Sequence, residues 1–106
     1  MASEITELTE ETFDQAVASG VALVDFWATW CGPCKTMGAL LESQVAPAVG
    51  DHARVCKVNI DEQPGLAVRF EVQAIPTLVL FKDGKQVESL LGVQKPEELV
   101  KKVKAL

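Results

Sequence analysis

The sequence predicts an α/β protein whose central mixed β-sheet of about five strands is flanked by about four helices. Three observations lead to this prediction. Val21 to Ala28 is apolar along its length, which is typical of a central strand that is covered on both faces. Arg54 to Ile60 is a second strand-like run, and a long helical pattern separates the two. Near the C-terminus, Asp83-Gly84 joins Thr77–Phe81 to Gln86–Leu91, which is a strong hairpin signal.

The elements at the N-terminus are short. Ile5 and Leu8 lie in a segment that fits an edge strand. Thr9 is a suitable N-cap for a first helix, which Gly20 would end. The predicted order of elements along the chain is β-α-β-α-β-α-β-β-α, and residues 1–106 are expected to form a single domain.

The longest helix is predicted from Pro33 to Val49. Its apolar residues recur at i, i+4 and i+8, at Met37, Leu41 and Val45. Pro33 suits the first turn, where its missing N–H costs nothing, whereas Pro47 is expected to end or bend the helix.

Two further helices are predicted in the second half of the chain. A short one covers Pro64 to Phe70, with Asp61 or a nearby residue as its cap. The last helix begins at Pro96. Its acidic residues come first and its lysines last, an order that suits the helix dipole.

Composition limits the possible functions. The net charge of −5 makes sequence-independent binding of nucleic acid unfavourable. The N-terminal residues lack the basic and apolar regions of a secretory signal, and no apolar run reaches the roughly 20 residues that span a bilayer. We therefore expect a cytoplasmic protein that binds neither nucleic acid nor membrane. We also expect it to be a monomer.

The segment Trp30-Cys31-Gly32-Pro33-Cys34 is the strongest functional signal. It follows a predicted strand and opens a predicted helix, so Cys31 is expected at the helix N-terminus. Unpaired backbone N–H groups and the helix dipole favour negative charge there, and a thiolate carries such a charge.

Three interpretations fit a close cysteine pair. A structural disulfide between Cys31 and Cys34 would close a very short loop and constrain the unfolded chain little. A zinc site would need His52 and Cys56 as further ligands, yet Cys56 lies in an apolar strand and His52 in a polar turn. A redox dithiol fits best: Cys31 attacks a disulfide and Cys34, one turn further, releases the reduced product. A histidine between the cysteines would favour an oxidant, and its absence points to a reductant.

The chain also resembles the thioredoxin family over essentially its whole length. The residues that carry the resemblance are Asp25-Phe26-Trp27-Ala28, Trp30-Cys31-Gly32-Pro33-Cys34-Lys35, Lys57-Val58-Asn59-Ile60-Asp61, Ile75-Pro76-Thr77, Phe81, Gly84 and Gly92. The resemblance implies the thioredoxin fold and a general protein-disulfide reductase.

The resemblance also implies roles for two charged residues. Asp25, in an apolar strand, would exchange a proton with Cys34, since burial raises the pKa of a carboxyl group. The alternative is an aspartate that only accepts hydrogen bonds from loop amides. Lys57 would be the charge partner of Asp25, or else a lysine whose stem follows apolar surface while its ammonium reaches solvent.

A substrate surface around Cys31 is implied in the same way. Spacing alone favours a trans Ile75–Pro76 bond, because few X–Pro bonds are cis, whereas the resemblance implies a cis bond that frees the Ile75 backbone to pair with an extended substrate. Trp30 is either a surface aromatic or a core residue. The expected substrate-binding residues are Trp30, Gly32, Pro33, Ile75, Pro76, Gly92 and Val93.

The implied partners follow from the reaction. The chain itself is expected to bind no cofactor and no metal, to receive electrons from an NADPH-dependent flavoprotein, thioredoxin reductase, and to reduce oxidised reductases and peroxidases. A protein of another functional class is the alternative: a binding or scaffold subunit with the same fold. Ala39, Ala74 and Phe70 replace a common proline, glycine and tyrosine of the family, and Cys56 is an additional thiol.

Overall fold

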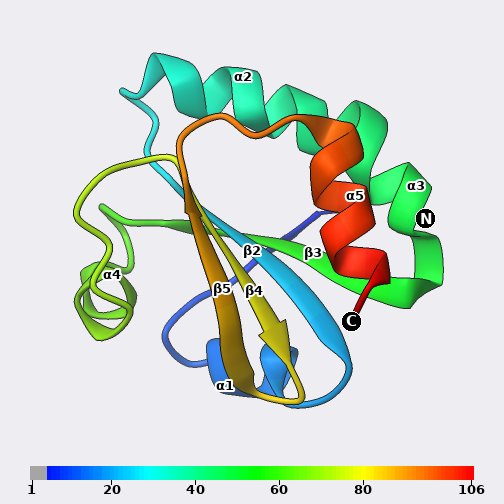
Figure 1. Ribbon diagram of the computed structural model, residues 1–106. Coiled ribbons are helices and arrows are strands. Elements are labelled where there is room, and N and C mark those ends of the chain that lie inside the picture. The colour runs from blue at the N-terminus through cyan, green and yellow to red at the C-terminus, as the bar shows by residue number, and fades with distance from the viewer. Residues whose placement is uncertain (1–4) are drawn as a thin grey trace.

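The computed structural model describes residues 5–106 and contains a five-stranded sheet with the strand order β1-β3-β2-β4-β5 (Figure 1). The strands are β1 (Thr6–Glu7), β2 (Val21–Trp27), β3 (Ala53–Asn59), β4 (Thr77–Lys82) and β5 (Lys85–Leu91). β1 and β2 each pair with β3 in parallel, whereas β4 pairs antiparallel with both β2 and β5. The predicted mixed sheet is confirmed, and the strand predicted from Val21 to Ala28 lies at its centre as Val21–Trp27.

Helices cover both faces of this sheet. They are α1 (Phe13–Val17), α2 (Gly32–Leu40), α3 (Ala46–Val49), α4 (Pro64–Arg69) and α5 (Pro96–Lys104). The long α2–α3 segment and α5 pack on one face, and α1 and α4 pack on the other (Figure 1). The predicted element order is confirmed. No helix within residues 5–106 is long and apolar enough to cross a membrane.

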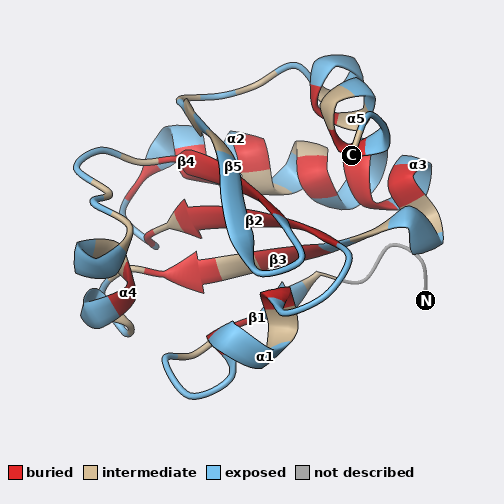
Figure 2. Ribbon diagram, turned by 60° about the horizontal axis from the view of Figure 1, so that its bottom comes forward, coloured by how far each residue is buried: buried red, intermediate tan, exposed pale blue. Residues whose placement is uncertain are grey.

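Side chains of β2 alternate between the two faces of the sheet. Val21 and Leu23 pack in the core beneath α2 and α5, whereas Val24 and Phe26 pack in the core beneath α1 and α4. Nearly the whole strand is buried (Figure 2). Because successive side chains point to opposite faces, Asp25 continues the face that lies beneath α2. A charged residue is therefore buried directly under the helix that carries the cysteines.

The predicted long helix is present from Gly32 to Val49, and its regular hydrogen bonding is interrupted just before Pro47. Between α2 and α3, residues Leu41–Val45 form a π-helical turn in which the Ala46 N–H donates to the Leu41 carbonyl. Pro47 then sits in the first turn of α3, and the helix continues to Val49. The ring of a proline inside an α-helix clashes with the carbonyl four residues earlier, and the wider turn gives it room. Pro47 therefore does not end the helix.

The cap of the first helix differs slightly from the prediction. The α-helix begins at Phe13 with Thr12 as N-cap, later than the predicted start at Thr9. Thr9 nevertheless caps the preceding turn, since the Thr12 N–H donates to Thr9 Oγ1 at 3.2 Å and the Thr9 N–H donates to Thr12 Oγ1 at 2.9 Å. This reciprocal pair works as a capping box does.

The short helix α4 is capped from a distance. Gln63 is its N-cap residue and makes no side-chain cap bond, so Asp61 is not the cap. The Gly65 N–H instead donates to Glu10 Oε2 at 2.7 Å, across 55 positions of sequence. The predicted hairpin and last helix are confirmed, with positive φ angles of 50° at Asp83 and 84° at Gly84.

Candidate active site: a dithiol at the start of helix α2

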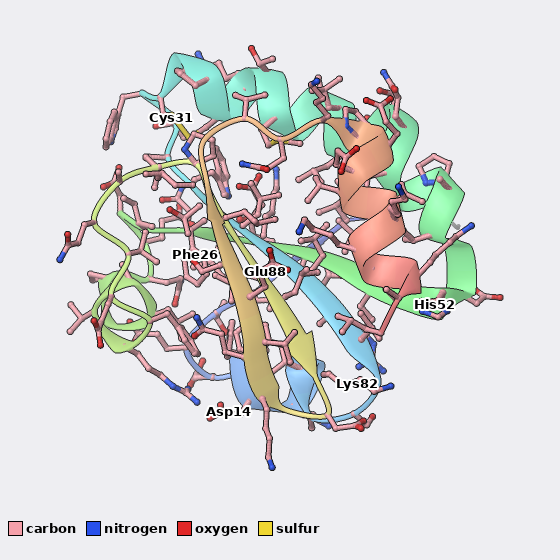
Figure 3. The ribbon with its side chains drawn as sticks, in the orientation of Figure 1. Asp14, Phe26, Cys31, His52, Lys82 and Glu88 are labelled. Carbon is pink, nitrogen blue, oxygen red and sulfur yellow. A yellow bond between two sulfur atoms is a disulfide. The ribbon has the colours of Figure 1, made fainter. Side chains whose placement is uncertain are left out.

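Cys31 is the N-cap residue of α2, and its Sγ accepts a hydrogen bond from the Cys34 N–H at 3.1 Å. Its backbone is still extended, while Gly32 and Pro33 are the first helical residues. The two cysteines form a disulfide, and their Cα atoms are 5.2 Å apart. Figure 3 shows Cys31 at the N-terminal end of α2, and the residue is 5% exposed. The second sulfur can therefore reach the first without any rearrangement of the helix.

Two loops close over the Cys31 side of the disulfide. The Ile75–Pro76 bond is cis, as the resemblance implies and contrary to the expectation from spacing. The Ile75 carbonyl oxygen lies 3.9 Å from Cys31 Sγ. The Pro76 carbonyl accepts a hydrogen bond of 2.8 Å from the N–H of Gly92, whose φ is 88°. The loop before β4 and the loop after β5 are thus held together beside the sulfur.

An apolar surface lies beside this site, and we call it the docking patch after the role that we propose for it below. Its members are Trp30, Gly32, Pro33, Ile75, Gly92 and Val93. Trp30 is 68% exposed and donates from Nε1 to Asp61 Oδ2 at 2.8 Å, so it is a surface aromatic and not a core residue. Pro33 and Val93 are exposed, while Ile75 and Gly92 are half-buried. Pro76 is buried behind the patch.

Asp25 lies on the other side of the disulfide, inside the protein. It is 1% exposed, and its Oδ1 has no hydrogen-bond partner among the described residues. Burial raises the pKa of Asp25 to about 7, while the charge of Lys57 lowers it and that of Glu7 raises it. The alternative role, an acceptor for loop amides, therefore does not describe Oδ1. The carboxyl group instead has the proton affinity of a group that titrates near neutral pH.

A cavity of about 600 Å³ connects the buried groups with the surface. Asp25 and Cys34 both line it. The other lining residues are Ile5, Trp27, Lys35, Gly38, Ala39, Leu41, Glu42 and Lys57. A carboxyl group and the second thiol thus share one solvent-accessible space, on the side of the disulfide opposite the docking patch.

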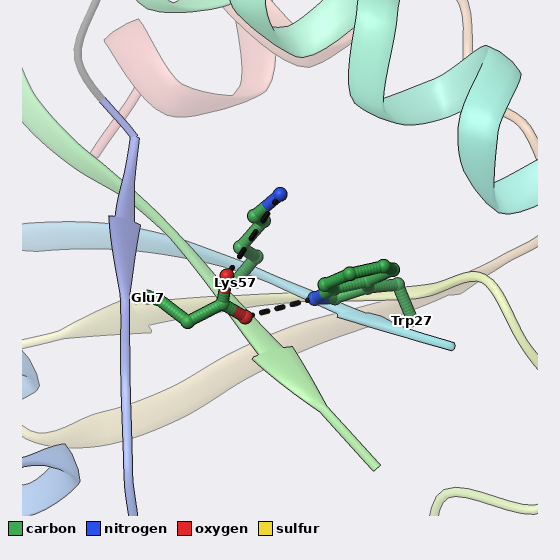
Figure 4. Close-up of polar contacts among 3 residues, drawn as sticks. All are labelled: Glu7, Trp27 and Lys57. Atoms are coloured by element: carbon green, nitrogen blue, oxygen red, sulfur yellow. Dashed lines mark hydrogen bonds and ion pairs between the residues drawn. The ribbon is translucent and has the colours of Figure 1, made fainter. Parts of the chain in front are cut away.

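Lys57 does not form an ion pair with Asp25. Its Nζ lies 3.9 Å from Glu7 Oε1 and 4.4 Å from the centre of the Trp27 ring (Figure 4). Its charge still reaches Asp25 through space, because the two residues are register partners on β3 and β2. The Lys57 side chain is 33% exposed, as expected for a lysine whose ammonium reaches solvent, and its charge lowers the pKa of Asp25 without an ion pair between the two residues.

The zinc ligands considered from the sequence are not assembled. Cys56 is fully buried in the core beneath α1 and α4, and burial raises the pKa of its thiol to about 11. His52 lies in the turn of 3₁₀ type before β3 and is exposed. Within residues 5–106, no group of three or more His, Cys, Asp and Glu side chains could hold a metal ion.

The comparisons with known proteins agree with this geometry. The family model of thioredoxin matches residues 4–105. A thioredoxin of Staphylococcus aureus is 48% identical over 95 residues, which cover 90% of both chains. A solved mutant thioredoxin from Halobacterium salinarum superposes with a TM-score of 0.89 at 34% identity, covering 98% of this chain and 91% of the other. A chain from a structural study of thiol resolution in yeast mitochondrial 1-Cys peroxiredoxin has a TM-score of 0.85 at 36% identity, covering 99% and 98%.

The fold and the paired cysteines define a thiol-disulfide oxidoreductase. The chain belongs to the thioredoxin family, and its fold is the thioredoxin fold. It is a protein-disulfide reductase, and a scaffold role is not favoured. Membership of the family also supports interaction with thioredoxin reductase and with oxidised protein substrates.

Two residues beside the site, Asp61 and Glu7, are not predicted from the sequence. Asp61 belongs to the segment that matches the family, but its position suggests only a cap for α4, whereas it holds the Trp30 indole. Glu7 carries no signal in the sequence, because its neighbours Trp27 and Lys57 are 20 and 50 positions away. Only the register of three strands brings these side chains together.

Proposed function

We propose that Cys31 is the nucleophile and Cys34 the resolving thiol of the reduction of protein disulfides. The Cys31 thiolate attacks one sulfur of the substrate, which forms a mixed disulfide and releases the first substrate thiolate. Cys34, as a thiolate, then attacks Cys31 Sγ and releases the second substrate thiolate. The substrate gains two electrons and two protons, and the protein is left with the Cys31–Cys34 disulfide. The observation that supports this order is the hydrogen bond from the Cys34 N–H to Cys31 Sγ, because the same donor at the helix N-terminus would stabilise a Cys31 thiolate in the reduced protein.

Asp25 is the proton exchanger of the second step in this proposal. Cys34 must lose a proton before it attacks, and Asp25 lines the same cavity. A carboxyl group whose pKa is raised to about 7 both accepts and returns a proton near neutral pH. The proton then passes from Asp25 to solvent in the cavity, and the departing substrate thiolate takes a proton from solvent on the side of the docking patch.

The docking patch binds the substrate beside Cys31. An extended segment of the partner pairs with the free backbone of Ile75, as in strand addition, and Trp30 supplies apolar contact area. Pro76, which has no N–H, leaves no competing donor next to the sulfur.

A trapping experiment tests the assigned order of attack. Cys34→Ser keeps the nucleophile but cannot resolve the intermediate, so an oxidised protein substrate should accumulate as a mixed disulfide with Cys31. The product is measured by non-reducing electrophoresis and peptide mass spectrometry. Accumulation on Cys31→Ser through Cys34, with only free protein in the Cys34→Ser sample, would reverse the assignment.

Truncation of the exposed indole tests the docking patch. For Trp30→Ala we expect KM for a protein disulfide to rise about tenfold, because buried aromatic anchors dominate protein interfaces. The rate with a small disulfide reagent should change much less. Val68→Ala on α4 is the matched control, since Val68 is 78% exposed but lies outside the patch. Equal effects of the two substitutions would contradict a docking role for Trp30.

The proposal extends to the partners and the setting of the protein. Electrons come from an NADPH-dependent flavoprotein, thioredoxin reductase, and the targets are enzymes that form a disulfide in each cycle, such as reductases and peroxidases. Residues 1–106 act as a monomeric single domain in the cytoplasm, where thiols are kept reduced, and use their own dithiol without a bound cofactor or metal.

A further inference from the structure

The strand register places Lys57 between two carboxylates. Lys57 on β3 is paired with Glu7 on β1 and with Asp25 on β2, and β3 lies between those two strands. Register partners project from the same face of a sheet and lie about 5 Å apart. The ammonium group can therefore be drawn to either side. Glu7 is on the exposed edge of the sheet, with a side chain that is 46% exposed, whereas Asp25 is buried.

Of the two carboxylates, it is Glu7 that forms the ion pair with the Lys57 ammonium. One oxygen of Glu7 pairs with Lys57 Nζ at 3.9 Å, and the other accepts a hydrogen bond of 3.0 Å from Trp27 Nε1 (Figure 4). The Lys57 ammonium also lies 4.4 Å from the centre of the Trp27 ring. We propose that Glu7 is a positioning residue of the dithiol reaction, which holds the Lys57 ammonium at the outer edge of the sheet and away from the Asp25 carboxyl group. This inference rests on the proposed role of Asp25.

Stability alone does not explain this cluster. Both side chains of the ion pair are a third or more exposed, and pairs of this kind contribute little to stability. The larger consequence falls on Asp25. A lysine that moved into contact with that carboxylate would stabilise its charge and lower its pKa, so that Asp25 would no longer hold a proton near neutral pH. When Glu7 holds Lys57 at the edge of the sheet, the pKa of Asp25 stays near neutral pH, which is the range that proton exchange requires.

The other titratable groups near Asp25 do not replace Glu7 in this role. Around the same cavity, α2 contributes Cys34 and Lys35, and the π-helical turn contributes Glu42. Among the described residues, the ion pair of Lys57 is with Glu7. Glu42 therefore offers a matched control: it is a carboxylate that lines the cavity without being paired with Lys57.

The test is the pKa of Asp25 in Glu7→Gln, followed through the side-chain carboxyl carbon by NMR across a pH titration. Glutamine keeps an oxygen that can accept the Trp27 hydrogen bond but removes the charge that holds Lys57. We expect the pKa of Asp25 to fall by about 1, the lower end of the effect of an opposite charge in contact. Glu42→Gln should lower it clearly less. An unchanged pKa in Glu7→Gln, or an equal fall in both variants, would overturn the proposal.

The Glu7 charge could also raise the pKa of Asp25 directly, without acting through Lys57. Comparing Lys57→Met with the double variant Lys57→Met, Glu7→Gln separates this direct effect from positioning. In a Lys57→Met background there is no ammonium to position, so Glu7→Gln should lower the pKa of Asp25 by at most about half as much as in the natural sequence. An equal fall in both backgrounds would show a direct field only and would overturn the positioning role. The titration needs no turnover, so these results stand apart from the trapping experiment, which alone decides the order of attack by the cysteines.

Discussion

Replacing Cys31 with serine is expected to lower the rate of protein-disulfide reduction by at least about a thousandfold, because the reaction passes through a covalent bond to this sulfur. Serine keeps the size and the N-cap function of the residue but is not a nucleophile toward disulfides at neutral pH. The measurement is turnover of a protein disulfide with dithiothreitol as the electron source, corrected for the rate without protein.

Cys56→Ser is the control for this loss. Cys56 is also a cysteine, but it is buried on the opposite face of the sheet, and burial raises the pKa of its thiol to about 11. Its removal should leave the turnover rate within about twofold, provided that the variant folds, which circular dichroism reports. A Cys31→Ser variant as active as the natural protein would refute the enzyme mechanism.

Asp25→Asn is expected to stabilise the oxidised protein at alkaline pH by about 4 kcal/mol and to change its stability little at pH 4. The pKa of Asp25 is raised from 3.8 to about 7 in the folded protein. Between these values the folded state binds more protons than the unfolded state, so the contribution of Asp25 to stability falls as pH rises and is constant above about 7. The folded and unfolded pKa values differ by about 3.2, and one pKa unit corresponds to about 1.36 kcal/mol, which gives the expected gain in stability of about 4 kcal/mol. Asparagine is neutral at every pH and avoids this loss.

Urea unfolding of both oxidised proteins between pH 4 and pH 9 measures the effect. The difference in the free energy of unfolding between Asp25→Asn and the natural protein should grow as the pH rises from 4 and become constant above about pH 7. A constant difference across the range would show that Asp25 does not titrate with a raised pKa. Asp25→Asn should also slow the resolution of the mixed disulfide by about a hundredfold in single-turnover experiments. A loss of this size is typical when a general base is removed.

Most of the fold was predictable because local patterns and tertiary packing agree. The apolar run of β2 has the form that a strand buried on both faces requires, and Asp83-Gly84 supplies the positive φ angles that the hairpin adopts. The place of Cys31 at the N-terminus of α2 followed from a strand that leads into a helix. The cis bond at Pro76 did not follow from spacing and came from the family resemblance alone.

The features that were not predicted depend on the three-dimensional arrangement. The π-helical turn at Leu41–Val45 is a local response to Pro47 and to packing beneath it, where periodicity predicts only a continuous helix. Glu10 caps α4 across 55 positions of sequence. The contact of Glu7 with Lys57 and Trp27 depends on the register of β1 against β3, and two-residue strands carry almost no pattern from which a register could be predicted.

The central claim is that the start of α2 holds the Cys31 sulfur partly as its anion. The most direct measurement is the rate of alkylation of Cys31 in the reduced protein as a function of pH, quantified by peptide mass spectrometry, with a cysteine in an unstructured peptide as the reference. We expect the rate for Cys31 to reach half of its maximum at a pH below about 8.5, the ordinary pKa of a cysteine, and Cys31 to react faster than the reference at pH 7. A Cys31 profile that coincides with that of the reference peptide would contradict the account.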